Sequence, residues 1–454
     1  MTSDFLAGVI EGFYGPPWSV AERREVLGWM QAWGLNTYFY GPKDDLHHRI
    51  FWRTPYAAAE RAEVAALIDD CAAHGVRFVY AMGPGLDVRY NDPADRVALE
   101  GRFAQLIEMG CRDFCLLFDD IPDRMRLEEL ERWGNLASAQ CALTNACVAW
   151  VRERLPKARF LFCPTPYCGR MESAGLGGPG YLETVGRELD PTVEVFWTGP
   201  EIISDEITVE HLEIMTAKLR RKPILWDNLH ANDYDGRRFY CGPYSGRDPA
   251  IRGMVGGILT NPNNEMPLDF MALRTLAAFV SAAGDWNPRQ AYLDGLQEWA
   301  PKFALVQGEV ILPELVLLGD CYYLPYAEGP EAESLFAGIR SVLSTPAATW
   351  GAEAVALRAR VVGLRDLCAR LAGLKYRSLF HALSRRIWEL REEMDLLERY
   401  LGHGLDPGTR DTPFHSDFHR LQTYRGGLVP RLQSLLVQEA DGSIRSGAME
   451  GRER

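Results

Sequence analysis

Asp119 and Asp120 are adjacent carboxylates that directly follow the apolar run CLLF at residues 115–118. Two close carboxylates in a partly dry cleft differ in pKa, so that one is ionised while the other keeps its proton near neutrality. Glycosyl transfer needs that division into a base and an acid. Because neighbouring side chains on a strand point to opposite faces, both acids reach one cleft only if the backbone turns at or before them. A helix N-cap is the competing interpretation of this pair.

An adjacent pair suits one mechanism of glycoside cleavage better than another. Most glycosidases place two carboxylates on different strands, about 5–9 Å apart across the scissile bond. Neighbouring residues cannot readily flank a sugar in that way. They can act from one side if a 2-acetamido oxygen of the substrate attacks C1, with one carboxylate orienting the amide and the other protonating the leaving oxygen.

Acids, amides and aromatics predominate among the residues that follow the other short apolar runs of the chain. These residues are Phe13, Tyr14, Lys43, Asp44, Asp45, Thr165, Tyr167, Trp197, Trp226, Asp227, Asn228, Asn232, Asp233, Asn261 and Asn263, together with Gly12 and Gly15. Such a mixture suits a neutral polyhydroxylated ligand, since hydroxyls need donors and acceptors while a sugar face stacks on rings. Each alone has a structural explanation, such as loop packing or an Asx turn. Their convergence favours a sugar site.

The elements that would position these residues alternate along the first 285 residues. Short apolar runs lie at 6–10, 36–40, 77–81, 113–118, 159–163, 193–197, 223–226 and 254–259. Segments of helical period lie between them, at 19–33, 57–74, 94–109, 134–154, 208–220 and 267–282. Eight strands over about 250 residues predict a (β/α)8 barrel, whose active site lies on the loops after the strands. A doubly wound sheet is the alternative, but EGFYGPPW does not resemble its Gly-rich phosphate loop.

Longer helical segments replace this alternation beyond residue 290. They lie at 301–319, 331–344, 350–373, 375–402 and 412–437 and predict a helical bundle. The expected domains are therefore a catalytic barrel at 1–288, an α-helical domain at 289–437 and a disordered tail at 438–454.

Composition limits the class of protein further. The net charge is −13 and the pI is near 5.3, which disfavours a nucleic-acid partner. The chain has no apolar run of membrane-spanning length and no recognisable signal peptide, so we expect a cytoplasmic protein with reduced cysteines and no membrane contact. His415 and His419 are four residues apart, but without a third ligand we expect no metal.

Seven segments resemble the signatures of one family. They are GVIEGFYGPPWS, LNTYFYGPKDDLHHRIFWR, FCLLFDDI, FLFCPTPYCG, VFWTGPEI, ILWDNLHANDYDGRRFYCGPY and GILTNPNNE. In this order they resemble the O-GlcNAc hydrolase and bacterial β-N-acetylglucosaminidase family, whose fold is a (β/α)8 barrel. They cover the whole predicted barrel, whereas the helical part resembles the family only in type.

The resemblance implies roles for individual residues. Asp119 would orient the acetamido group while an oxazoline forms, and Asp120 would be the general acid and later the general base. Sugar-binding roles fall on Gly12, Lys43, Tyr167, Trp226, Asn228, Asp233 and Asn263, with Trp197 as a further pocket candidate. No cofactor is implied.

The expected activity is that of a retaining exo-β-N-acetylglucosaminidase acting on O-GlcNAc of proteins by substrate assistance. A GlcNAc-terminated glycan, including a cell-wall fragment, is the alternative substrate. A silent GlcNAc-binding module and a metal-dependent hydrolase with Asp119, Asp120 and Asp233 as ligands are the rivals from other classes. A monomer and a homodimer are both compatible with the sequence.

Overall fold

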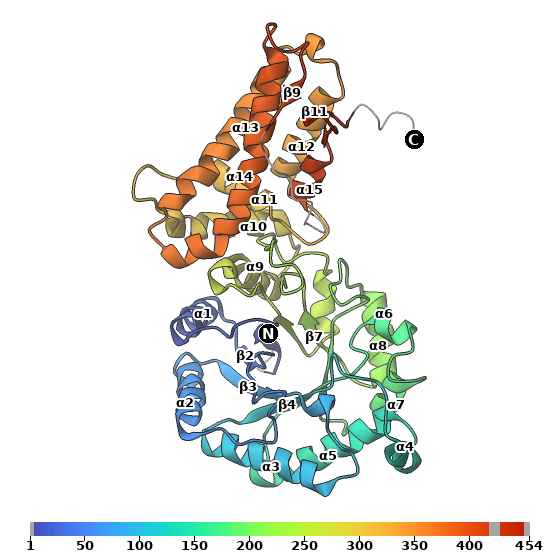
Figure 1. Ribbon diagram of the computed structural model, residues 1–454. Coiled ribbons are helices and arrows are strands. Elements are labelled where there is room, and N and C mark those ends of the chain that lie inside the picture. Colours follow the sequence, from blue (N-terminus) through green and yellow to red (C-terminus); the bar gives the residue numbers. More distant parts are fainter. Residues whose placement is uncertain (1–3, 417–426, 449–454) are drawn as a thin grey trace. The chain divides into compact units, whose positions relative to one another are not determined.

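Eight parallel strands form a closed barrel in the computed structural model, which describes residues 4–416 and 427–448 (Figure 1). The strands follow the chain order, and Gly8 of the first strand aligns with Thr37 of the second and Leu259 of the eighth, which closes the ring. Their bounds are β1 Leu6–Glu11, β2 Thr37–Tyr40, β3 Arg77–Met82, β4 Asp113–Leu117, β5 Phe160–Cys163, β6 Glu194–Trp197, β7 Ile224–Asp227 and β8 Gly257–Thr260. The predicted barrel is confirmed, and each strand overlaps its predicted apolar run.

Helices surround the barrel between successive strands (Figure 1). They are α1 Val20–Trp33, α2 Ala58–Ala73, α3 Pro93–Glu108, α4 Leu127–Trp133, α5 Leu136–Arg154, α6 Gly169–Ser173, α7 Tyr181–Glu188, α8 Val209–Leu219 and α9 Phe270–Ser281. Helix α1 shows how local sequence sets their bounds: Ser19 and Glu22 form a capping box, and Gly34 ends the helix at φ 73°. Helices α4, α6 and α7 match none of the predicted helical segments.

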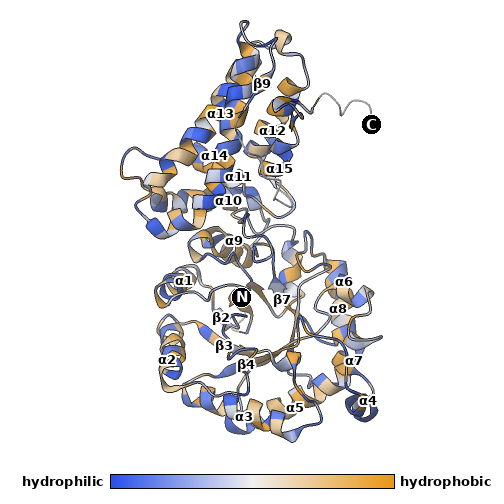
Figure 2. Cartoon of the chain, viewed as in Figure 1, coloured by the Kyte–Doolittle hydropathy of each residue, from blue (hydrophilic) through white to orange (hydrophobic). Residues whose placement is uncertain are grey.

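The barrel interior is filled by apolar side chains from all eight strands. Ile10, Phe39, Val79, Leu117 and Leu259 are all buried in one cluster. This is the packed interior expected of an eight-stranded barrel. Figure 2 shows that the surrounding helices carry hydrophobic and hydrophilic residues side by side, as amphipathic helices do. Because the interior is apolar, we look for the chemistry on the loops at the ends of the strands.

Chain contacts divide the protein into two compact units. The first comprises residues up to 233, 244–266 and 272–288, and the second comprises 234–243, 267–271 and the chain from 289. The second unit contains α10 Pro288–Trp299, α11 Leu312–Asp320, α12 Pro330–Leu343, α13 Ala352–Arg370, α14 Arg377–Leu405 and α15 Leu428–Gln433. Helix α14 buries Leu379, Leu383, Ile387 and Leu390, spaced three and four residues apart along one face. Two barrel loops thus belong to the helical unit.

The end of the chain differs from its prediction. A small antiparallel sheet of β9 Phe414–His415, β10 Leu436–Gln438 and β11 Ser443–Ser446 replaces part of the predicted last helix and part of the predicted disordered tail. Ile444 is buried, so packing gives this hairpin the order that its polar composition did not suggest. His419 lies outside the described residues, among which no group of three or more His, Cys, Asp or Glu could hold a metal. The described chain also has no helix with the length and hydropathy needed to cross a membrane.

Candidate active site

The acid pair lies where the chain leaves β4, and a backbone turn separates its two members. Asp120 has a φ of +50°, and it and Arg220 are the only non-glycine residues with positive φ in the described chain. Side chains other than glycine rarely adopt this left-handed conformation, and where they do it often serves a functional site. The turn between the acids that the sequence required is therefore present at Asp120.

Asp119 is held by a buried lysine from the loop after β2. The Lys43 Nζ lies 2.5 Å from Oδ2 of Asp119, and the two side chains are 4% and 10% exposed. Burial by itself would raise the pKa of Asp119, but the charge and hydrogen bond of Lys43 outweigh burial and lower it. Burial likewise opposes the charge of Lys43, yet Asp119 raises the pKa of this lysine. Asp119 and Lys43 are therefore both charged. One member of the acid pair, Asp119, is thus ionised, as expected.

Asp120 is exposed and is bound by two tyrosines. The Tyr167 hydroxyl donates to Oδ1 at 2.8 Å, and the Tyr14 hydroxyl donates to Oδ2 at 2.9 Å. Burial and the charge of Asp120 raise the pKa of Tyr167, so this phenol stays protonated. Arg49 donates to the Tyr14 hydroxyl and to the backbone carbonyl of Asp120, both at 2.7 Å. These contacts fix the orientation of Tyr167, which the sequence had left open.

Trp226 and Asn228 form a wall near the lysine. The Trp226 ring lies 5.9 Å from the Lys43 Nζ, and its indole N–H donates to Oδ1 of Asn228 at 3.0 Å. Asn261 donates to the same oxygen at 3.0 Å, while its own Oδ1 is buried and lacks a hydrogen-bond partner in the described structure. An unpaired buried acceptor is costly, so Asn261 is suited to bind a donor on a ligand.

Gly12 allows the loop after β1 to approach this wall closely. A Cβ on Gly12 would lie 2.9 Å from the Trp226 ring, which is closer than two carbon atoms can pack. Further along the same loop, the backbone N–H of Tyr14 donates to Oδ2 of Asp233 at 3.1 Å. Lys43, Asp119, Trp226 and Asn228 thus form one chain of contacts at one end of the barrel, and Asp233 contacts the neighbouring loop through Tyr14.

Two predicted site residues are completely buried. Asn263 is completely buried, with an exposed fraction of 0%, whereas Asn261 is 6% exposed. Trp197 is also completely buried, and its indole N–H donates to Nε2 of His211 on α8 at 2.8 Å. Its neighbour Phe196 belongs to the barrel interior, so strand alternation turns Trp197 outward toward the helices.

Sequence reasoning assigned no role to three residues that the structure places in the site. Tyr14 and Asn261 follow predicted strands, but the sequence indicates no individual role for them. It gives no separate signal for Arg49. Arg49 lies within the segment LNTYFYGPKDDLHHRIFWR, six residues after Lys43, which was the available signal.

The arrangement separates an ionised acceptor from an exposed acid. Asp119 can accept a hydrogen bond from a ligand amide, and Asp120 can exchange a proton with a ligand oxygen. Such a division fits hydrolysis assisted by a substrate amide.

Known proteins resemble this chain in sequence and in fold. Protein O-GlcNAcase of Rattus norvegicus and that of Mus musculus are each 43% identical over 278 residues, which is 61% of this chain and 30% of each relative. The chain therefore spans about a third of the length of these relatives. A mutant of the Thermobaculum terrenum O-GlcNAc hydrolase has a TM-score of 0.75 at 27% identity, covering 88% of this chain and 83% of that one. CpGH84B, at 23% identity and a TM-score of 0.75, covers 89% of this chain and 70% of its own and shares the fold.

The family comparison covers the barrel and the start of the helical unit. A model described as β-N-acetylglucosaminidase matches residues 7–308, which is more than half of the chain. The chain therefore belongs to the β-N-acetylglucosaminidase family.

Proposed function

We propose that this protein is a retaining exo-β-N-acetylglucosaminidase that removes O-GlcNAc from Ser and Thr of proteins. The names of its relatives, Protein O-GlcNAcase and O-GlcNAc hydrolase, support this substrate. The observation that carries the proposal is the unequal environment of the acid pair: Asp119 is bound to Lys43, whereas Asp120 is exposed beside two tyrosine hydroxyls. The ten free, buried cysteines fit the cytoplasm, where thiols stay reduced.

In the first step, Asp119 acts on the acetamido group of the substrate. Its carboxylate accepts a hydrogen bond from the acetamido N–H, which turns the acetamido oxygen toward C1. A bond forms between that oxygen and C1 while the bond from C1 to the leaving oxygen breaks, giving an oxazoline. Positive charge grows on the amide as this happens, and a carboxylate kept ionised by Lys43 stabilises it.

Asp120 manages the protons of both steps. It gives its proton to the departing Ser or Thr oxygen, and then accepts one from the water that attacks C1 and opens the oxazoline. Two inversions at C1 give net retention. Tyr14 and Tyr167 remain bonded to Asp120 in either state, because a phenol can both donate and accept a hydrogen bond.

The remaining polar residues would hold one sugar. In this proposal Gly12 and Lys43 contact its hydroxyls, Asp233 binds the distal hydroxyls, and Trp226, Asn228 and Asn261 enclose the acetamido group. No step uses a metal or cofactor. A monomer and a homodimer are both compatible with this proposal.

Substrates with an increasingly fluorinated N-acyl group test the proposal. Fluorine lowers the basicity of the acyl oxygen, so kcat/KM for an aryl GlcNAc glycoside should fall steeply across the series. A flat response would indicate an enzymic nucleophile. Binding of GlcNAc without turnover would indicate the silent module, and loss of activity with a chelator would indicate the metal-dependent hydrolase.

A further inference from the structure

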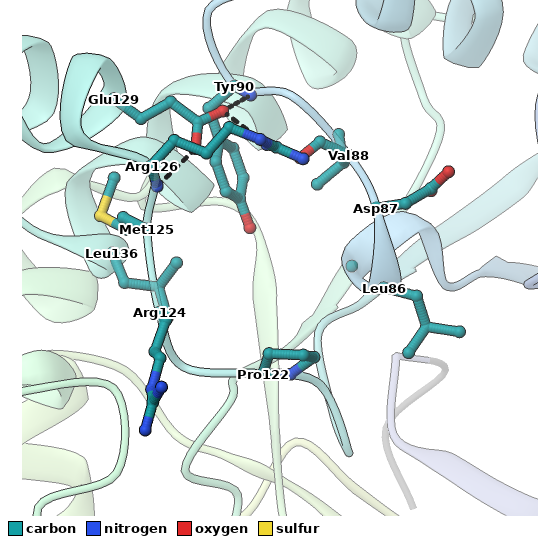
Figure 3. A pocket seen from close by; sticks show the side chains of 11 residues that line it. Leu86, Asp87, Val88, Tyr90, Pro122, Arg124, Met125, Arg126, Glu129 and Leu136 are labelled. Carbon is teal, nitrogen blue, oxygen red and sulfur yellow. Dashed lines mark hydrogen bonds and ion pairs between the residues drawn. The ribbon is translucent and has the colours of Figure 1, made fainter.

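A hollow lies near the acid pair, between the loop after β3 and the loop after β4. Its volume is about 180 Å³, which is smaller than the roughly 300 Å³ of the smallest typical ligand pockets. Leu86, Val88, Met125 and Leu136 supply apolar lining (Figure 3). The size suits a single amino-acid side chain rather than a second sugar.

This hollow is directly connected to the loop that carries Asp120. Pro122, two residues after Asp120, lines it. Since a chain spans at most about 3.6 Å per residue, the two Cα atoms are no more than roughly 7 Å apart. A Cβ on Gly85 would lie 2.7 Å from the Ile121 side chain, so the two loops are in contact. Because Asp120 protonates the leaving oxygen in the proposed function, the leaving group must lie beside this loop.

Most charges that line the hollow are already neutralised. Arg126 donates to Glu129 at 3.2 Å and to the carbonyl of Val88 at 3.1 Å. Asp87 forms an ion pair with Arg53 at 2.5 Å. These groups therefore have little attraction left for a ligand.

Arg124 is different. Its side chain is exposed and forms no hydrogen bond or ion pair with the described residues. Figure 3 shows it extending away from the Arg126–Glu129 pair, with no interaction drawn to it. Asp123, the exposed neighbouring residue, does not line the hollow. The hollow thus has apolar walls and one positive charge without a partner.

We propose that this hollow, lined by Leu86, Val88 and Arg124, is a subsite for the polypeptide that carries the sugar and receives an acidic side chain near the glycosylated Ser or Thr. Arg124 pairs with the carboxylate, and the apolar walls contact its methylene groups. This rests on the proposed function, which places the polypeptide on the Asp120 side. An extended chain rises about 3.3 Å per residue, so an acid two or three positions from the glycosylated residue has the required reach.

Matched glycopeptides test the subsite. One series carries O-GlcNAc-Ser with Glu at a single position two or three residues before or after it, and the control series carries Gln there. For one position, kcat/KM should be about three- to fivefold higher with Glu, the size expected of an exposed ion pair. The variant R124E should remove or invert this preference. K157E reverses the charge of an exposed residue at the opposite end of the barrel, before β5, and should keep it.

The walls provide a second variant. Leu86 is 44% exposed, so L86W adds bulk at the hollow without disturbing a packed core, and should lower kcat/KM for the Glu peptide toward that of the Gln peptide. Equal rates for Glu and Gln peptides at every position would overturn the subsite, as would a preference that survives R124E or is lost equally in K157E. Hydrolysis of a simple aryl GlcNAc glycoside by the wild type is measured in parallel, because its absence would reject the proposed function instead.

Discussion

The strands β4 and β7 both lead to an aspartate bound to a basic residue, but the two aspartates are bonded very differently. Asp227 accepts two bonds from Arg247 at 2.8 Å, one from the Tyr244 hydroxyl at 2.7 Å and one from the Leu229 N–H at 3.2 Å. Asp119 accepts one, from Lys43 at 2.5 Å, and no described residue donates to its Oδ1. Asp227 is fully buried, whereas Asp119 remains 9% exposed.

This difference distinguishes a carboxylate that stabilises the fold from one kept for a ligand. Two carboxylate oxygens provide about four acceptor positions, and Asp227 has used them all. Asp119 keeps an oxygen available while a single lysine holds it ionised. An ion pair at a strand end therefore indicates a ligand site only when its acid is incompletely satisfied.

The largest effect on activity is expected from substitution of Asp120, the neighbour of Asp119. Asp120→Asn should lower kcat by about 10²–10⁴-fold for a peptide or alkyl glycoside, whose leaving oxygen needs a proton. An activated aryl glycoside should lose much less, because its leaving group departs without one. Steady-state rates on both substrates measure the contrast. Equal losses would remove Asp120 from the role of general acid.

Asp119→Asn tests the incompletely satisfied acid directly. The neutral amide cannot stabilise the charge that forms on the acetamido group, so kcat should fall by about 10²–10³-fold. Peptide and aryl substrates should be affected alike, since both form the oxazoline. Rates are measured on protein shown to be folded by circular dichroism. A loss confined to one substrate would contradict the assignment.

Asp227→Asn is the matched substitution at the satisfied acid. It leaves the Arg247 cation buried without its partner, which should lower the free energy of unfolding by about 3–5 kcal/mol. Activity of the molecules that remain folded should change far less than in Asp119→Asn. Urea unfolding and active-site titration separate the two quantities. If Asp119→Asn were the more destabilising and the less inactivating of the two, the comparison would be reversed.

The stability of the protein should depend on pH in the acid range through the Asp227 carboxylate. Burial tends to raise the pKa of Asp227, but Arg247 outweighs burial and lowers it. A lowered folded-state pKa means that the stabilisation is complete above the unfolded value of about 3.9 and is lost as pH falls through the folded value. Wild-type protein should lose stability in that acid range. The Asp227→Asn variant should be less stable than the wild type at neutral pH, and its stability should change less as the pH falls.

The smallest effect on activity is expected from substitution of Trp226, which lies in the wall of the sugar site. Trp226→Phe keeps an aromatic ring between Phe39 and Phe196 but removes the N–H that donates to Asn228. A neutral hydrogen bond contributes about 0.5–1.5 kcal/mol, so kcat/KM should fall by about two- to tenfold. Titration with free GlcNAc checks whether binding accounts for the loss. An unchanged kcat/KM would mean that the indole N–H does not position Asn228 for the substrate.

Much of the barrel could be predicted because its signals are local. The apolar runs fall on the eight strands, and Ser19 and Gly34 bound the first helix as their cap preferences indicate. The acid pair could be located for the same reason, since it directly follows an apolar run. Short polar segments gave no such signal, so the β10 and β11 hairpin was missed.

Sequence alone determined the strand alternation, the loops that bear the site and the adjacency of Asp119 and Asp120, since each depends on neighbouring residues. Only the tertiary structure decided that Asn261 donates to Asn228, that Trp197 donates to His211 on α8, and that Tyr14 and Arg49 meet Asp120. Closure of the barrel brings together residues as far apart in the sequence as Tyr14 and Asp120, which are 106 positions apart, and burial decides which polar atoms remain open to a ligand. Residue spacing encodes neither the contacts between distant loops nor the burial of individual polar atoms.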